Sequence, residues 1–484
     1  MSTVVGPSDT AALEAATAAV PGQSKRELNQ RRRVLVMSTA AFTLMFAVWL
    51  MFGMLSVPIR QEFGLTDVQL AWLLAVAVLN GALWRLFTGI AADRWGGKKV
   101  FLFLLIGSAI PTYLVSTVTG FTMLLVYAFL AGFAGNSFSA GISWVSAWYP
   151  QRHQGFALGV FGAGNVGASI TKMIAPALII VVPAAGYLGG FIPGGWRFVP
   201  FMYAVLLLIM AGVLGFVVPK VDRMPGKGRP FKEMVRPLKQ MRVWRFSLYY
   251  VVVFGAYVAL AAWLPHYYVD VYGMSIMSAG FLAALFIFPA SLLRPVGGAI
   301  SDRIGARRVL TWTFVVMLIA SGVLMMPHGH IVLSGEGGSP DRSVLPWEPG
   351  VVLFTVLVFI LGIAMGVGKA AVFKHIPEYF PHDVGAVGGL VGMLGALGGF
   401  FLPLLFGYTN AWTSAPQSTF GVLFLVTLLA AIWMQFTVMR IVQKKSPEMK
   451  HEFDHMLPDT TKSDARTQLV SATTSTNTTK GDQS

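Results

Sequence analysis

The sequence predicts an all-α membrane protein of twelve transmembrane helices, arranged as two pseudo-symmetric six-helix halves. Three observations lead to this fold class. The 484 residues are 55% hydrophobic and only 12% charged, whereas a soluble domain carries about 25% charged residues. Twelve apolar runs each have about the 20 residues that cross a bilayer as a helix. A helix-to-loop motif near the end of the second run returns near the end of the eighth.

Six apolar runs precede a polar linker and six follow it. The N-terminal half, residues 34–218, contains predicted spans at 34–57, 69–92, 99–118, 121–148, 155–183 and 198–218. The C-terminal half, residues 244–440, contains predicted spans at 244–269, 277–300, 308–327, 350–373, 384–407 and 418–440. Residues 219–243 form the linker. The polar segments 1–33 and 441–484 are predicted to be disordered cytoplasmic tails.

The charge distribution predicts the orientation. A net charge of +15 would suggest nucleic-acid binding in a soluble protein. Here the basic residues gather in the linker and in loops on one side, whereas the opposite loops are nearly free of lysine. The positive-inside rule therefore places both termini and the linker in the cytoplasm. We expect the protein to contact the lipid bilayer and to bind no nucleic acid. Without cysteine, disulfides and thiolate metal sites are excluded, and no cofactor or metal is expected.

The repeated motif indicates how the two halves work together. The segment from Arg85 to Lys99 contains a glycine, an Asp-Arg pair, a second glycine and two basic residues, and the segment from Arg294 to Arg308 repeats this order. Two halves related by an axis along the membrane normal place a substrate site between them, near the bilayer midplane. The repeat therefore predicts an alternating-access architecture.

Each copy of the motif begins with an arginine inside an apolar run. Arg85 and Arg294 lie about two turns before their Asp-Arg pairs, or roughly 12 Å, which is too deep for snorkelling. No Asp or Glu occurs in the apolar core of any predicted span. A buried cation without a partner is costly, and an anionic substrate could supply that partner. Two guanidinium groups facing each other suit a small planar oxyanion, so the residues alone predict an anion transporter.

Glycine-rich runs occupy the fifth and eleventh predicted spans. Small residues at helical spacing let helices pack closely, and helix packing explains part of this pattern. Asn165 lies within the first run, and a buried amide requires a polar partner or a ligand. The glycines concerned are Gly162, Gly164 and Gly167 in the first run, and Gly392, Gly395, Gly398 and Gly399 in the second.

The duplicated Gly-x-x-x-Asp-Arg-x-Gly-x-Arg/Lys-Arg/Lys motif resembles the signature loop of the major facilitator superfamily. This resemblance implies the major facilitator fold. It also implies a gating role at the cytoplasmic face for Gly89, Asp93, Arg94, Gly298, Asp302 and Arg303.

The paired glycine runs and paired arginines are similar to those of the nitrate/nitrite porter family (NarK/NasA type), over all twelve spans. The resemblance implies that Arg85 and Arg294 clamp nitrate, with Asn165 as a polar contact. Nitrite is a further candidate substrate, and the chain is expected to act as a monomer. The resemblance implies aromatic walls from Phe46, Phe138, Tyr250 and Phe254.

The tenth span departs from the exchangers of that family and resembles its proton-symporter branch. It contains Lys369 at a place where the exchangers of the family have a run of neutral residues. When Tyr149-Pro150 is aligned with Phe380-Pro381, Lys369 becomes the counterpart of Phe138 in the repeat. A buried lysine near other cations readily loses its proton. Our hypothesis is that Lys369 is neutral in the empty site and takes up a proton with nitrate. The alternative is a lysine that snorkels to the cytoplasm.

The leading interpretation is uptake of nitrate together with protons across the cytoplasmic (inner) membrane. Nitrate/nitrite antiport is the alternative within transport, favoured by the missing membrane carboxylate and opposed by Lys369. Phosphate or an organic acid fits the glycine runs less well. A non-transporting sensor on the same fold would require a folded signalling domain, and none is visible. The sequence contains no Walker motif, nucleophile elbow or carboxylate pair, so an enzyme is not expected. Lys172 and His266 lie nearer span ends and are assigned no role.

Overall fold

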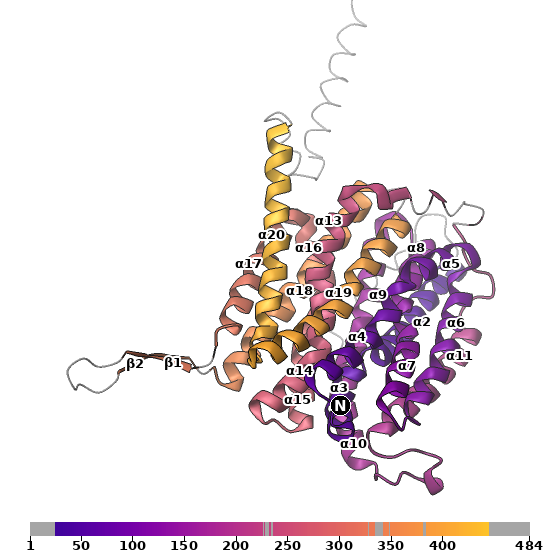
Figure 1. Cartoon of the computed structure of the whole chain (residues 1–484). Coiled ribbons are helices and arrows are strands. Elements are labelled where there is room, and N and C mark those ends of the chain that lie inside the picture. The colour runs from indigo at the N-terminus through magenta and orange to yellow at the C-terminus, as the bar shows by residue number, and fades with distance from the viewer. Residues whose placement is uncertain are drawn as a thin grey trace, which may run out of the picture.

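Two helix bundles stand side by side in the computed structural model (Figure 1). The structure describes residues 25–225, 227, 232–233, 236–327, 329–333, 342–347, 349–380 and 384–444. Eleven helices or helix runs are long and apolar enough to cross a membrane, and the bent pair Ile276–Leu292 and Arg294–Ser301 makes a twelfth. The predicted all-α fold of two six-helix halves is confirmed.

The first bundle contains six spans, four of which are interrupted. Short breaks or 3₁₀ turns divide these four spans into shorter helices. Its elements are α2 (Lys25–Trp49), α3 (Phe52–Phe63), α4 (Asp67–Leu83), α5 (Arg85–Trp95), α6 (Gly97–Val115), α7 (Phe121–Ala131), η1 (Gly132–Asn136), α8 (Ser137–Trp148), α9 (Gln151–Ala163), η2 (Gly164–Val166), α10 (Gly167–Val181) and α11 (Phe198–Val217).

The second bundle contains longer uninterrupted helices at its C-terminal end. Its first span is interrupted by the π-helical segment η6. Its elements are α13 (Met241–Tyr250), η6 (Val251–Gly255), α14 (Ala256–Tyr272), α15 (Ile276–Leu292), α16 (Arg294–Ile304), α17 (Ala306–Leu324), α18 (Val351–Tyr379), α19 (Val384–Thr413) and α20 (Ser418–Lys444).

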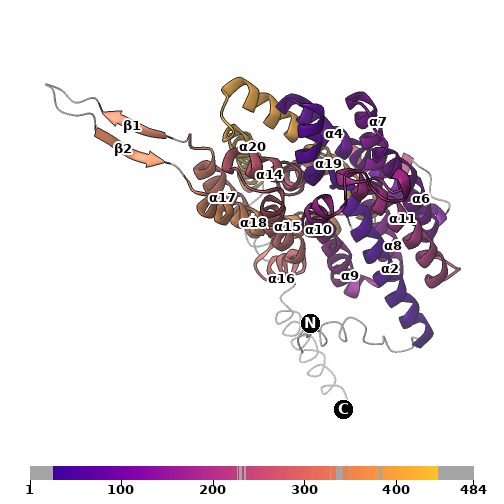
Figure 2. The same ribbon diagram turned by 90° about the horizontal axis from the view of Figure 1, so that it is seen from below.

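Three boundaries differ from the sequence-based prediction. Helix α2 begins at Lys25, inside the segment predicted as a tail, and there Glu27 pairs with Arg31 at 3.1 Å and with Arg223 at 2.5 Å. Helix α20 continues to Lys444. The predicted loop at 328–349 contains an antiparallel hairpin, β1 (Gly329–Leu333) and β2 (Arg342–Trp347), which projects from the bundle in Figure 2. The predicted tail segments 1–24 and 445–484 lie outside the described residues.

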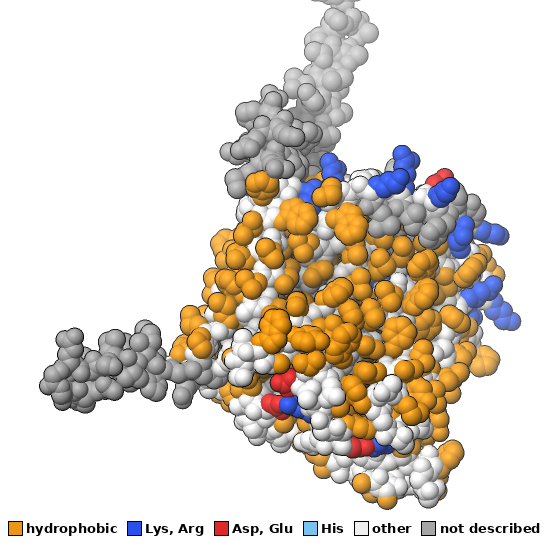
Figure 3. All heavy atoms as spheres, viewed as in Figure 1, with side chains coloured by type: hydrophobic (Ala, Val, Ile, Leu, Met, Phe, Trp, Pro, Cys, Tyr) orange, Lys and Arg blue, Asp and Glu red, His pale blue; other side chains and the backbone are white. Residues whose placement is uncertain are grey.

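The side of the molecule is apolar, as contact with lipid requires. Large hydrophobic side chains such as Phe103, Ile110 and Phe216 are exposed on it, and Figure 3 shows hydrophobic side chains covering the middle of one face. Lysine and arginine gather at the end where α13 begins and α20 ends. Exposed apolar surface of this extent marks a membrane-embedded protein.

The duplicated motif has the same backbone geometry in both halves. Trp84 ends α4 with φ −91° and ψ 1°, and Leu293 ends α15 with φ −81° and ψ 0°. After each short helix, Gly96 and Gly305 adopt φ near +90° (91° and 89°), a region that favours glycine. The repeat in the sequence is therefore a repeat in the fold, and each arginine of the pair opens a new helix directly after a break.

Asp222 fastens the start of the linker to the first bundle. Its Oδ2 accepts a hydrogen bond from the Lys98 backbone N–H at 2.8 Å. Its Oδ1 accepts from the indole N–H groups of Trp144 and Trp148 at 3.0 and 2.8 Å. Because the carboxylate lies at the N-terminus of α6, the helix dipole also favours its negative charge. One side chain thus joins α6, α8 and the linker.

We predict that Asp222→Ala destabilises the protein by about 3 kcal/mol, because one backbone and two indole N–H donors lose a charged acceptor. Thermal unfolding in detergent should show a lower Tm. Asp222→Asn keeps one acceptor oxygen without the charge, so its Tm should lie between those of the native protein and Asp222→Ala. An unchanged Tm in both variants would show that this carboxylate is dispensable.

Candidate functional site

Arg85 and Arg294 lie inside the protein, at the interface between the bundles. Arg85 is fully buried and Arg294 is 7% exposed. They are close enough to repel each other electrostatically. Among the described residues neither forms an ion pair with a carboxylate. Two adjacent buried cations without a counter-ion create a strong positive potential in a low-dielectric region.

Arg85 is held by both bundles. Its Nε donates to the carbonyl of Gly81 at 2.8 Å, and its Nη1 donates across the interface to the carbonyl of Gly392 at 3.3 Å. The guanidinium carbon lies 4.8 Å from the ring centre of Trp49 and 5.2 Å from that of Phe254. Nη2 has no hydrogen-bond partner within the described residues. Two carbonyls and the aromatic faces fix the guanidinium plane, and one N–H edge stays available.

Arg294 approaches the opposite bundle in the same way. A Cβ on Gly162 would lie 3.1 Å from its Nη1, so the absence of a side chain there lets the guanidinium group approach α9. That Nη1 has no hydrogen-bond partner. The Tyr250 hydroxyl interacts electrostatically with both guanidinium groups and is a hydrogen-bonding neighbour of that of Arg294. Each arginine therefore approaches the glycine-rich span of the other half.

Phe138 lies within cation–π distance of both arginines. Its ring centre is 5.3 Å from the guanidinium carbon of Arg85 and 5.5 Å from that of Arg294. It stacks on Phe254 at 6.1 Å and 22°. A π-face bordered by two cations is electrostatically favourable. The same ring can lie flat against a planar anion held by both guanidinium groups.

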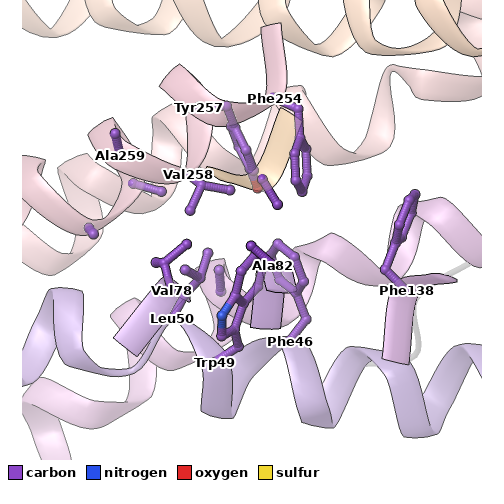
Figure 4. Close-up of a cluster of buried hydrophobic side chains, with 14 of the residues drawn as sticks. Phe46, Trp49, Leu50, Val78, Ala82, Phe138, Phe254, Tyr257, Val258 and Ala259 are labelled. Carbon is purple, nitrogen blue, oxygen red and sulfur yellow. The ribbon is translucent and has the colours of Figure 1, made fainter. Parts of the chain in front are cut away.

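The predicted aromatic residues form two layers. Tyr250 stacks on Phe254 at 4.8 Å and 7°; the π-helical segment η6 contains Phe254 and begins directly after Tyr250, and π-bulges commonly occur at functional sites. Phe46 packs edge-on against Trp49 at 5.4 Å, so it supports a ring that Arg85 covers. Figure 4 shows Phe46 and Trp49 facing Phe254 and Tyr257 across the interface, with Phe138 to one side.

Asn165 lies near the arginine pair on the same span as Gly162. Its side chain is fully buried, and neither its oxygen nor its nitrogen has a partner. It follows Gly162, which touches Arg294, by about one helical turn. Residues three apart on a helix lie on the same side. Asn165 therefore adds an uncommitted amide to the surroundings of the pair.

The glycine runs permit these close approaches. A Cβ on Gly395 would lie 2.2 Å from the Tyr250 ring, and one on Gly398 would lie 2.9 Å from Val251. In the other half a Cβ on Gly167 would lie 2.0 Å from the carbonyl of Thr43. Gly164 and Gly399 are similarly crowded, by Phe42 and Val258, whereas Gly392 has room.

Lys369 is fully buried and its Nζ has no hydrogen-bond partner. The nitrogen lies 3.3 Å from the ring centre of Tyr257, whose hydroxyl is hydrogen-bonded with Ser291 at 3.2 Å. Arg294 repels it electrostatically. The ammonium group therefore stays inside the protein, beside the arginine pair, and does not reach the surface.

Comparison with known proteins identifies the family. The family model described as the Major Facilitator Superfamily matches residues 37–336 and 343–473. The chain belongs to the major facilitator superfamily. Within the superfamily it belongs to the nitrate/nitrite porter family, as its relatives show.

Two relatives support this membership, and one solved structure shares the fold. The chain is 64% identical, over 90% of its length and 98% of the relative, to the probable nitrate/nitrite antiporter NarK1 of Thermus thermophilus. It is 30% identical, over 83% of its length and 94% of the relative, to the probable nitrate transporter NarT of Staphylococcus carnosus. These relatives are transporters, not enzymes, in agreement with the sequence. A bacterial homologue of the human lysosomal transporter Spinster, inward-facing and occupied, shares the fold with a TM-score of 0.67 at 16% identity, over 88% of this chain and 100% of that one.

The major facilitator motif lies on α5 and α16 and continues past the glycines that end them. Gly89 faces α8, where a Cβ would make only ordinary contact with Ser139, and Gly298 has open space. Asp93 and Arg94 take part in further interactions. Arg303 is exposed, and the side chain of Asp302 lies outside the described residues. The gating role of the motif remains a prediction.

A salt-bridge cluster joins the two halves at the end opposite the linker. Arg60 pairs with Asp67 at 2.9 Å and also with Asp270 of the other half. His266, to which the sequence assigned no role, lies 3.4 Å from Asp270 and contacts the Arg60 guanidinium group. Three of these side chains have metal-ligand chemistry, but Arg60 already supplies their positive partner. The cluster is therefore an ionic closure between the halves.

Sequence reasoning missed several residues beside the site. Trp49 follows Phe46 by three residues, and Tyr257 follows Phe254 by three, so helical spacing alone could have indicated both. Phe373 meets Tyr250 edge-on at 4.9 Å and follows Lys369 by one turn. The sequence places Lys172 near a span end, yet it is fully buried and its Nζ has no partner among the described residues.

We predict that Gly395→Ala abolishes most transport, because its Cβ would displace the Tyr250 ring from the site. The matched control is Gly389→Ala in the same helix, where the nearest atom would lie 3.9 Å away, and it should keep near-native activity. Uptake of the transported anion into proteoliposomes measures both. Equal activities would mean that Tyr250 need not hold its position.

Proposed function

We propose that this transporter moves nitrate across the cytoplasmic membrane by alternating access. The supporting observation is the pair of buried guanidinium groups, one from each half, with no described carboxylate paired with either. Guanidinium forks match the geometry of planar oxyanions. The names of the relatives, a probable nitrate/nitrite antiporter and a probable nitrate transporter, agree with this substrate.

The geometry suggests how nitrate drives closure. Without an anion, Arg85 and Arg294 repel each other across the interface. A bound nitrate neutralises part of that repulsion. Its oxygens can accept from Arg85 Nη2 and Arg294 Nη1, which have no hydrogen-bond partner among the described residues, and from the neighbouring Tyr250 hydroxyl. A ligand shifts a conformational equilibrium only by its differential affinity for the states. Because one arginine comes from each half, nitrate binds best when the two halves are closed around it. Its binding therefore allows the transporter to change the end at which the site is open.

The proposed orientation places both termini and the linker in the cytoplasm. The exposed lysine and arginine side chains gather at the end that bears the linker (Figure 3), as the positive-inside rule predicts for cytoplasmic loops. The cluster of Arg60, Asp67, His266 and Asp270 then lies at the external end and has to open for nitrate to enter from outside.

We propose further that Lys369 couples protons to nitrate. Burial and the neighbouring Arg294 disfavour its ammonium form in an empty site. Nitrate between the arginines would lower the local positive potential and so favour protonation of Lys369. The loaded site would then carry one proton with the anion, and the empty transporter would return with a neutral lysine. This coupling would make uptake independent of an internal counter-anion.

Nitrate/nitrite exchange is the second candidate. The name of the Thermus relative favours it, and so does the repulsion between Arg85 and Arg294 in the empty site. If Lys369 stayed protonated, three cations would lie together whenever the site is empty. The transporter could then change its open end only with an anion bound, which is obligatory exchange.

The flux of the native protein in liposomes tests the proposed function and separates the two modes. With an inward proton gradient and no internal nitrite, we expect nitrate uptake accompanied by acidification of the interior. Uptake that starts only after internal nitrite is supplied would establish exchange instead. No nitrate flux under either condition would refute nitrate as the substrate.

Two substitutions of Lys369 make a sharper prediction about coupling. Lys369→Gln should permit nitrate movement without acidification, because no proton-binding group remains beside Arg294. Lys369→Arg stays charged, so it should lose net uptake and keep exchange between internal and external nitrate. Undiminished proton uptake with nitrate in Lys369→Gln would exclude this lysine as the coupling group.

A further inference from the structure

One side of the span formed by α9, η2 and α10 carries buried polar atoms without hydrogen-bond partners. These atoms are the Asn165 side-chain oxygen and nitrogen, the Ser169 Oγ and the Lys172 Nζ. The three residues are spaced i, i+4 and i+7, which places them along one side of a helix. We call Asn165, Ser169 and Lys172 the α10 polar face. It extends for about two turns, or roughly 10 Å, from the arginine pair toward the proposed external end.

The α10 polar face is directed at the other half. Before it in the chain, Gly162 touches Arg294. Beyond it, a Cβ on Gly280 of α15 would lie 2.9 Å from Pro176 and 2.3 Å from the carbonyl of Lys172. Figure 2 shows α10 beside α15. Contacts with the C-terminal half therefore occur at both ends of the face, and the face lies in the interface that alternating access opens and closes.

Thr171 provides the contrast on the same helix. Its hydroxyl is hydrogen-bonded with Tyr203 at 2.7 Å and with the carbonyl of Gly167 at 3.1 Å. Both partners belong to the N-terminal half. The polar side chain that packs within its own half is satisfied, whereas the three on the interface side are not.

No carboxylate in the described part of the chain forms an ion pair with Lys172. The facing helix α15, Ile276–Leu292, contains no charged residue, and the Lys172 Nζ has no hydrogen-bond partner among the described residues. A lone buried cation is destabilising, and a methionine of similar length would avoid that cost. A lysine at an interface that separates during the cycle is explained if its partner is an anion that arrives when the interface opens.

We infer that Lys172, Ser169 and Asn165 form a second binding site for a small oxyanion, outside the central arginine pair. The inference rests on the proposed function and orientation. When the external end opens, α10 parts from α15 and the face becomes a wall of the entry path. Lys172 attracts the anion first, Ser169 and Asn165 offer polar contacts along the face, and Arg294 receives it at the inner end. Electrostatic attraction of this kind raises capture at low ligand concentration.

The experiment measures the external nitrate concentration that half-saturates uptake into proteoliposomes. Lys172→Met should raise it about tenfold with little change in maximal rate, because the loss affects capture from outside. Lys172→Arg, which keeps the charge, should remain near the native value. Ile170→Met, on the lipid-facing side of the same helix and 41% exposed, is the matched control and should change nothing.

The sequence contains no cysteine, which permits a second test of the charge itself. Lys172→Cys should behave like Lys172→Met. Reaction with a cationic methanethiosulfonate ethylammonium reagent should restore most of the native half-saturation, and the anionic ethylsulfonate reagent should not. If the Lys172 variants do not fold, Ser169→Asp is the alternative variant. It keeps the lysine and gives it a carboxylate partner one turn away on the same helix. It should raise the half-saturating concentration to a similar degree.

The outcomes separate this inference from the proposed function. Native protein that carries nitrate while Lys172→Met shows unchanged half-saturation would overturn the second site and leave the proposed function intact. Arginine and methionine variants that behave alike would overturn it too, because the lysine would then act through its shape. Absence of nitrate flux in the native protein refutes the proposed function before any variant is compared.

Discussion

The structure depends on a repulsion that lies between its two halves. Arg85 and Arg294 are buried, close to each other, and not paired with any described carboxylate. Aromatic faces and backbone carbonyls hold them in place, and such groups stabilise a cation less than a carboxylate does. The electrostatic interaction between the two halves is therefore incomplete at the centre of the interface. A small anion completes the interaction, which makes the binding of substrate and the closing of the interface one event.

The glycine runs serve both the arginine contacts across the interface and the close packing of helices. Arg85 reaches Gly392 in the C-terminal half, and Arg294 reaches Gly162 in the N-terminal half. Gly162 leaves space for the Arg294 guanidinium group, whereas Gly392 offers its backbone carbonyl to Arg85. The absence of a side chain at Gly395 leaves room for the Tyr250 ring. Close helix approach and substrate binding are thus consequences of the same residues.

Beyond the arginine pair, unpaired polar atoms of the described residues lie along the proposed path of the anion. Ser169 and Lys172 are buried against a facing helix without charge, while the ionic cluster of Arg60 and Asp270 closes the same end between the halves. A closed interface that contains uncompensated polar groups is only modestly stable. This limited stability suits a transporter, because an interface that must open in each cycle cannot be packed as tightly as a core.

The sequence by itself determined the fold class and the position of the arginine pair. Hydrophobic runs and the duplicated motif are local or periodic signals, and Trp84 and Leu293 show that the repeat survives as repeated backbone geometry. The partners of those arginines could not be predicted, because contacts such as Arg85 with Trp49 join different spans. Lys172 shows this limit most clearly. Its position in the sequence suggested a span end, and only the packing of α10 against α15 decided that it is buried at the interface.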